Sequence, residues 1–141
     1  MANLIPFAFR GELFTGTHNF ASGGDSFKLA LYTANPYTTA STAYSATSEV
    51  SASGTNYTTT GNALTGNAVA YGTAVASCDF ADTEWTTATF TAAFGAIYND
   101  DQSDKLCVVL DFSGDKTATN GTFKITFPSP STPADAIISM A

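Results

Sequence analysis

Few side chains in this chain can perform covalent or metal chemistry. There is a single histidine, His18, and there are two cysteines, Cys78 and Cys107. Serines and aspartates are plentiful, so a Ser-His-Asp arrangement around His18 is compatible with the composition, but no GxSxG elbow supports it. We therefore expect His18 to be an ordinary exposed or partly packed residue. No CxxC or Cys/His spacing predicts zinc, and we interpret both cysteines as small buried apolar residues in a protein that folds in a reducing cytoplasm.

Acidic residues gather at two places where a hard cation such as calcium is conceivable. One group lies in a polar loop and the other precedes the single tryptophan: Asp100, Asp101 and Asp104, and Asp79, Asp82 and Glu84. The loop lacks the EF-hand ligand order, and polar residues at a hairpin tip need no metal. Paired carboxylates beside Trp85 are also typical of glycosidases, but this pattern is short and common. Scattered glycines form no phosphate loop. We predict no catalytic residue, no cofactor and no metal, and hence a non-enzymatic protein.

The net charge of the chain limits the classes of partner that it can bind. The net charge is -7 with a pI near 4.2, and the five basic residues lie far apart in the sequence. Neutralising phosphates requires clustered Lys and Arg, so we predict no nucleic-acid partner, and anionic membrane surfaces are disfavoured for the same reason. The first six residues lack a basic stretch and resemble neither a signal peptide nor a membrane span. Acidity of this kind is compatible with docking on a basic protein surface.

The elements that must position any site are short and alternate in polarity. A chain of 141 residues with only 12% charged residues and many β-branched threonines favours one all-β domain. We predict eight or nine strands in a two-sheet β-sandwich, with jelly-roll-like connections compatible with their order. The expected strands are 26–33, 68–71, 73–80, 86–91, 92–99, 105–112, 121–127 and 136–140. Residues 113–116 and 120–121 are expected turns. Strand 105–112 is apolar on both faces, which predicts a central strand or one that lies under a partner.

Two segments lie outside this strand pattern. Residues 1–24 are rich in phenylalanine without helical spacing or clean alternation, so we predict an N-terminal arm with a possible first strand, ahead of a single β-sandwich domain over 25–141. Residues 34–67 are rich in Thr, Ser and Ala, and we expect an ordered surface connection. Its anchors are expected to be Tyr37, Tyr44, Val50, Tyr57 and Leu64.

An ordered set of short matches gives the chain a family resemblance. The matching residues are 25–33 (DSFKLALYT), Tyr44 with Glu49 and Val50, 79–82 (DFAD) with Trp85, 95–99 (GAIYN), 109–112 (VLDF), 121–123 (GTF) and 136–138 (AII). Taken in order, the set resembles small tailed-bacteriophage virion proteins of the capsid cement or decoration type. The chain departs from their pattern at residues 92–94, where an Arg-Gly pair is expected, and at Cys107, where alanine is expected.

The resemblance implies a jelly-roll-like β-domain that binds the outside of an HK97-type phage capsid. Its partner would be the major capsid protein, whose neighbouring subunits it would clamp as a homo-oligomer, with a dimer favoured. It would be located on the capsid exterior of the virion, after assembly in the host cytoplasm. Two other functions stay open: a tail or fibre accessory protein of the virion, and a carbohydrate-binding module that uses exposed tyrosines and Trp85.

The apolar residues of the N-terminal arm are the expected partner contacts. These residues are Leu4, Ile5, Phe7, Phe9 and Phe14. An extended arm can add a strand to the sheet edge of a neighbour. The alternative is that the phenylalanines of the arm fill the core of their own domain.

Overall fold

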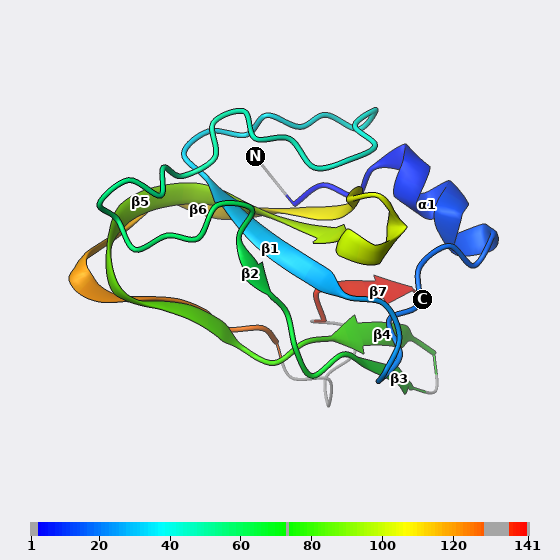
Figure 1. Cartoon of the computed structure of the whole chain (residues 1–141). Helices are drawn as coiled ribbons and strands as arrows, with labels where there is room; N and C mark the ends of the chain where they lie inside the picture. The colour runs from blue at the N-terminus through cyan, green and yellow to red at the C-terminus, as the bar shows by residue number, and fades with distance from the viewer. Residues whose placement is uncertain (1–2, 73, 129–135, 141) are drawn as a thin grey trace.

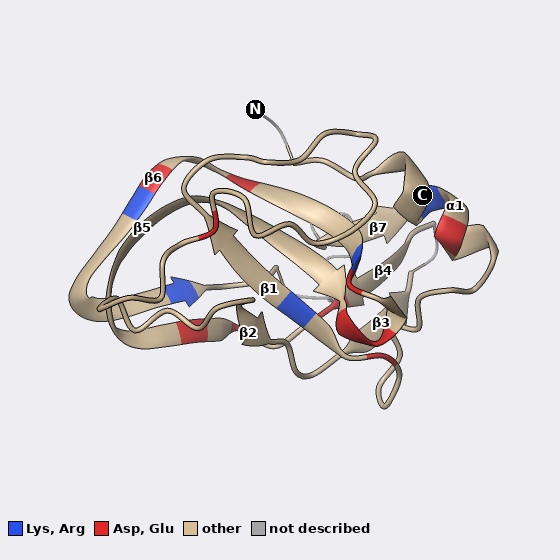
Figure 2. Cartoon of the chain, turned by 45° about the horizontal axis from the view of Figure 1, so that its top comes forward, with Lys and Arg blue, Asp and Glu red and all other residues tan. Residues whose placement is uncertain are grey.

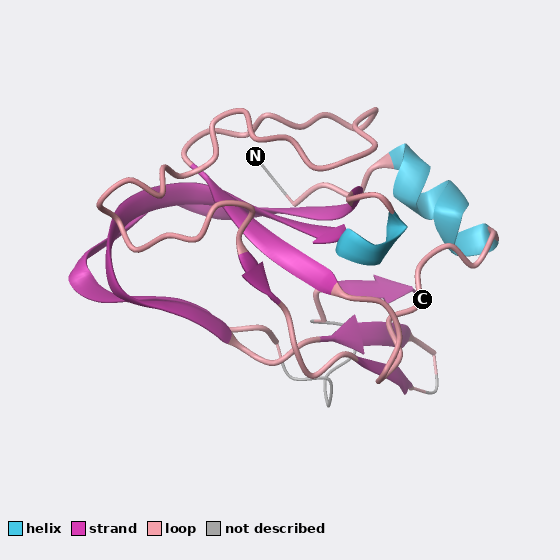
Figure 3. Cartoon of the chain, in the orientation of Figure 1, coloured by secondary structure: helices cyan, strands magenta, loops and turns pink. Residues whose placement is uncertain are grey.

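The chain forms two antiparallel sheets, shown in Figures 1 and 3, in a computed structural model that describes residues 3–72, 74–128 and 136–140. One sheet has the order β2-β1-β5-β6 and the other the order β3-β4-β7. The strands are β1 (Phe27–Tyr32), β2 (Asn62–Ala63), β3 (Ala68–Tyr71), β4 (Ala76–Asp79), β5 (Thr83–Asn99), β6 (Lys105–Ile125) and β7 (Ile138–Met140). This confirms the predicted all-β, two-sheet sandwich, although the described residues form seven strands rather than eight or nine.

The strand count differs because four expected strands merge into β5 and β6, which form one long bent hairpin, while the short β2 was not expected. The expected break at residue 92 and the expected turns at 113–116 and 120–121 all lie within these strands, so those predictions were wrong. Ser113, Gly114 and Asn120 do adopt positive φ values of 58°, 113° and 47°. They act as irregularities in the pairing, because bulged residues bend a strand without ending it. Turn-forming residues therefore curve the hairpin, as Figure 1 shows at its outer end.

The main core lies between the two sheets. Phe27, Leu29 and Leu31 point from β1 into this core, as their alternation predicts. Cys78 of β4 and Ile138 of β7 enter the same cluster from the three-stranded sheet. The core is rich in aromatic rings that contact one another, among them Phe20, Phe80, Trp85, Phe90, Phe123 and Phe127.

A second apolar cluster covers the other face of the four-stranded sheet. It contains Tyr32, Tyr98 and Leu106. The connection between β1 and β2 lies over this face of the sheet (Figure 3). The Tyr32 and Tyr37 hydroxyls are 2.6 Å apart, and the Tyr98 hydroxyl donates to the Thr60 carbonyl at 2.6 Å. The predicted ordered connection is confirmed. Four of its expected anchors are buried and the fifth is partly buried: Tyr37, Val50, Tyr57 and Leu64, and Tyr44.

Strand β6 is an edge strand, so the first alternative for 105–112, a central strand, was wrong, while the second, a strand that lies under a partner, stays a prediction. Its outer face is apolar because the connection covers it. A one-residue bulge at Cys107 also changes the expected alternation: Ile97 pairs with Val108, whereas Tyr98 pairs with Leu106. Leu106 therefore faces the second cluster, while Cys107 and Val108 both face the main core.

The N-terminal segment contains a helix, α1 (Phe7–Phe14), and not the predicted strand. Pro6 precedes it with φ -62° and ψ 152°, a position where its missing N–H costs no hydrogen bond. Leu4 forms a single antiparallel bridge with Val109 at the edge of β6. The helix was missed because phenylalanines on both of its sides obscure the helical period and Gly11 lowers its intrinsic propensity.

Candidate protein-binding surface

Helix α1 presents two different faces. Phe9 is 0% exposed and Leu13 is partly buried against the core, whereas Phe7 is 61% and Phe14 91% exposed. Residues 7, 10 and 14 share one side of a helix, so Arg10 lies on the same exposed face as the two phenylalanines. Exposed aromatic rings beside an arginine are typical of protein interfaces.

The five predicted contact residues therefore separate into three groups. Phe9 belongs to the main core, and its prediction as a partner contact was wrong because no partner can reach a fully buried ring. Leu4 and Ile5 are partly buried against the two apolar clusters. Phe7 and Phe14 are exposed and accessible to a partner. Within the described residues, the apolar surface extends to the neighbouring sheet, where Met140 is 57% exposed.

An apolar groove of about 420 Å³ separates α1 from β7. Its lining residues are Ile5, Phe9, Arg10, Leu13, Phe14, Ile138, Ser139 and Met140. Because successive side chains of a strand point to opposite faces, a groove that touches three successive residues of β7 runs along the edge of that strand. We call this feature the α1–β7 groove. Sequence reasoning missed it, since it depends on a helix that was not predicted.

Strand β7 is the last strand of its sheet, paired on one side with β4. No described residue forms a backbone hydrogen bond with its other edge. Such an edge presents unpaired N–H and C=O groups that can pair with another chain. The α1–β7 groove thus combines apolar walls with an available strand edge.

Arg10 stands at the rim of this groove and has no carboxylate partner among the described residues. Its guanidinium lies 5.3 Å from the ring centroid of Phe7, and Nη2 donates to the Ile5 carbonyl at 3.2 Å. Three of the other basic residues do pair with carboxylates: Lys28 with Asp100 at 2.9 Å, Lys105 with Glu12 at 2.6 Å and Lys124 with Asp82 at 3.0 Å. Figure 2 shows how sparsely charged residues are distributed over the ribbon. In an acidic chain, an unpaired arginine is available to bind an acidic group.

A partly buried polar network fastens the inner side of α1 to the four-stranded sheet. Glu12 Oε1 accepts a hydrogen bond from Lys105 Nζ at 2.6 Å, and Oε2 lies 2.8 Å from His18 Nε2. Asn99 Nδ2 donates to His18 Nδ1 at 3.0 Å, so the proton of a neutral His18 lies on Nε2 and points to Glu12. Burial raises the pKa of Glu12, but Lys105 and His18 outweigh burial and hold the pKa below its usual value. The carboxylate therefore stays ionised and holds the helix in place.

This network also brings His18 close to Cys107, a pair that could in principle form a nucleophilic site. The Sγ and Nδ1 atoms are 4.0 Å apart, but Nδ1 already accepts from Asn99, and Cys107 is 0% exposed. Burial raises the pKa of the Cys107 thiol well above its usual value. These features disfavour the thiolate that nucleophilic attack needs. His18 is buried against the Phe9 ring, with centroids 5.0 Å apart, so its prediction as an exposed or partly packed residue was wrong.

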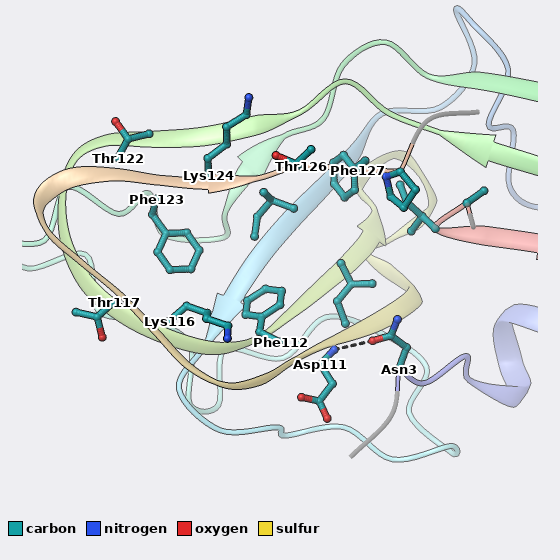
Figure 4. Close-up of a pocket in the computed structure, with 15 residues that line it drawn as sticks. Asn3, Asp111, Phe112, Lys116, Thr117, Thr122, Phe123, Lys124, Thr126 and Phe127 are labelled. Atoms are coloured by element: carbon teal, nitrogen blue, oxygen red, sulfur yellow. Dashed lines mark hydrogen bonds between the residues drawn. The ribbon is translucent and has the colours of Figure 1, made fainter. Parts of the chain in front are cut away.

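A second groove, of about 600 Å³, lies in the concave side of the bent strand β6 (Figure 4). Phe112 and Phe123 point into it from the two halves of the strand, and Lys116 lies between them. At one end, Asn3 Oδ1 accepts a hydrogen bond from the Asp111 amide at 2.8 Å. Lys116 forms no ion pair with a described carboxylate, which makes it a natural counterpart to Arg10 in experiments.

The aromatic residues expected for carbohydrate binding lie mostly inside the protein. Trp85 is 3% exposed, and its ring stacks on Tyr57 with centroids 5.8 Å apart. In the carbohydrate-binding alternative, the part assigned to Trp85 was therefore wrong, because the ring is buried. Of the tyrosines, Tyr71 is 84% exposed, while four others are buried: Tyr32, Tyr37, Tyr57 and Tyr98.

The acidic loop has a structural role in the fold. Asp100 pairs with Lys28, and Asp101 Oδ2 accepts a hydrogen bond from the Ser26 amide at 2.7 Å. Among the described residues, no group of three or more His, Cys, Asp or Glu side chains is placed to hold a metal ion. No helix in the described part of the chain is long and apolar enough to cross a membrane.

Comparisons of the chain with protein-family models, with curated proteins and with solved structures find no match.

Proposed function

We propose that this chain is a non-enzymatic structural protein of a phage virion: a jelly-roll-like cement or decoration protein that binds the outer surface of an HK97-type capsid. The observation that carries the proposal is the exposed apolar face of α1 beside the α1–β7 groove. Phe7 and Phe14 are 61% and 91% exposed on a helix that a partly buried network holds in place, and apolar surface that continues to an exposed Met140 is of the kind that marks interaction sites. The ordered resemblance to cement proteins then supplies the partner, the major capsid protein.

Such a protein would strengthen a capsid because the same small contact is repeated over the whole shell. A capsid under internal pressure fails at its weakest contacts between subunits. A small domain that bridges two subunits adds buried surface at each such contact, and multiple contacts raise the overall strength well above that of one. A protein that binds the assembled shell better than free subunits also stabilises the shell by mass action. A dimer on the capsid exterior would present two copies of the α1 face.

Particle binding tests the proposal directly. The purified chain is mixed with empty heads assembled from the major capsid protein of the same genome, and the heads are sedimented. We expect the chain to sediment with the heads and to raise the temperature at which they disrupt. Gold labelling of intact virions then distinguishes head from tail. A chain that stays in the supernatant, or that labels only tails or fibres, would reject the capsid assignment, and tail labelling would favour a tail or fibre accessory protein.

A further inference from the structure

We propose that the α1–β7 groove receives an extended segment of the capsid protein, which adds as a strand to the outer edge of β7 and places a carboxylate against Arg10. This inference rests on the proposed function and identifies the kind of segment that is bound. The segment would carry apolar side chains toward α1 and at least one aspartate, glutamate or C-terminal carboxylate near the rim.

The shape of the groove favours a strand as the occupant. The groove follows the three successive residues of β7 from Ile138 to Met140, and the outer edge of that strand has no backbone partner among the described residues. An incoming strand satisfies these backbone groups by forming the hydrogen bonds of a sheet. Across the groove, Leu13 and Phe14 provide an apolar wall for alternate side chains of that strand. Main-chain pairing supplies affinity, and the wall of α1 supplies selectivity.

The charge at the rim favours a segment with a carboxylate. Arg10 is the one basic residue that lines this groove, and its five N–H donors are used only once within the described residues, by the Ile5 carbonyl. Its position over the Phe7 ring keeps the guanidinium oriented at the surface. A guanidinium with free donors binds a carboxylate in a two-pronged arrangement that also fixes the register of the bound segment.

A second copy of this chain fits the groove less well than a different protein does. A two-fold contact uses the same patch on both subunits, so it would bring together two Arg10 side chains, and none of the described residues that line the groove carries a carboxylate to pair with them. We therefore assign the groove to the capsid partner, and a dimer would use another surface.

A pair of charge reversals tests the role of Arg10. Arg10→Glu and Lys116→Glu each change the net charge equally, and each removes a cation that has no ion-pair partner among the described residues. Binding to empty heads is measured by sedimentation, and circular dichroism confirms that both variants are folded. We expect Arg10→Glu to weaken binding by about tenfold or more, since it replaces a charge-assisted hydrogen bond with repulsion. Lys116→Glu lies in the other groove and should bind within about twofold of the unchanged chain, as a surface charge remote from the contact does.

Hydrogen exchange measured on the head-bound chain tests strand addition. We expect amides of residues 138–140 to become protected on heads, while the exchange of β3 at the opposite sheet edge stays unchanged. If the chain binds heads but Arg10→Glu binds equally well, or if β7 gains no protection, the inference is overturned and the proposed function stands. Protection of β7 that grows with concentration in the chain alone would assign the groove to a second copy and overturn our assignment. Absence of head binding by the unchanged chain would overturn the proposed function, and the inference with it.

Discussion

Two phenylalanines on the same helix should respond in opposite ways to the same substitution. Phe9 is 0% exposed, belongs to the main core and contacts Phe20 edge-on with ring centroids 6.1 Å apart. Phe14 lies five residues later in the same helix and is 91% exposed. If α1 is fastened to the sandwich as the structure shows, Phe9→Ala removes a core side chain, whereas Phe14→Ala removes only surface.

The expected magnitudes follow from these burials. Replacing a fully buried phenylalanine by alanine lowers the free energy of unfolding by about 3–5 kcal/mol, because the transfer free energy of the ring is lost and a cavity is left behind. For a domain of this size, that loss lowers the melting temperature by roughly 10–17 °C. Phe14→Ala should change the free energy of unfolding by at most about 0.5 kcal/mol, and alanine's higher helix propensity favours a slight gain.

Urea unfolding followed by fluorescence of the single tryptophan measures both variants. Trp85 is 3% exposed in the main core, so its emission reports loss of that core. The midpoint for Phe9→Ala should fall while the slope against urea stays unchanged, as two-state unfolding requires. A loss below about 1 kcal/mol for Phe9→Ala, or equal losses for Phe9 and Phe14, would contradict the docking of α1, because a docked Phe9 must cost more than that.

Three further predictions concern the network, the thiols and the glycines. The pKa of Glu12 is lowered in the folded state, so its contribution to stability is present above its ordinary pKa and is lost as the pH falls through the folded value. The destabilisation caused by Glu12→Gln should therefore be largest near neutral pH and should shrink on acidification. A destabilisation that does not change with pH would contradict the role of the ionised carboxylate. Burial raises the pKa of Cys78 to about 12 and raises that of Cys107 well above its usual value. Neither thiol should therefore react with a disulfide reagent at pH 8 until guanidinium unfolds the chain. Rapid reaction of the thiols in the native protein would refute their burial. Gly61 has a φ of +84°, and a Cβ there would lie 2.0 Å from the Leu29 carbonyl oxygen, so Gly61→Ala should strongly destabilise the folded protein. The matched Gly11→Ala places its methyl in open space on α1 and should stabilise the fold by up to about 1 kcal/mol. Similar melting temperatures for the two variants would contradict this difference.

The sequence predicted the strands whose burial is decided locally. The alternation of Phe27, Leu29 and Leu31 identified β1, because one face of that strand meets the core and every second residue must be apolar. The same reasoning does not predict that the two halves of β6 form one continuous strand. Ser113 and Gly114 are typical turn residues, and only the pairing with β5 shows that their positive φ values bend the strand instead of ending it.

The candidate site was predicted in part, and the missing part depends on tertiary contacts. The phenylalanines near the N-terminus identified the correct segment, but which of them is accessible depends on the packing of the helix. Phe7 and Phe9 are two residues apart and of the same type, yet one is 61% and the other 0% exposed. Only a helix docked by one side produces that difference. The sheet residues of the network are far from the helix in sequence: Asn99 contacts His18 and Lys105 contacts Glu12, and no local pattern links either pair.

The partly buried network gives the exposed face of α1 a property that hydrophobicity alone does not provide. A helix of eight residues is too short to be stable by itself in water, so an isolated N-terminal arm would have to fold when it binds and would lose affinity to that ordering. Glu12 and His18 fix the helix to the sheet from its inner side, while Phe9 anchors it in the core. The outer face, with Arg10 and Phe14, is thereby held in one conformation, so that the proposed partner would bind it without first having to order the helix. Weakening the network should therefore reduce binding even though none of its residues touches the partner, and Glu12→Gln measured on heads at neutral pH should show this loss while leaving the groove residues unchanged.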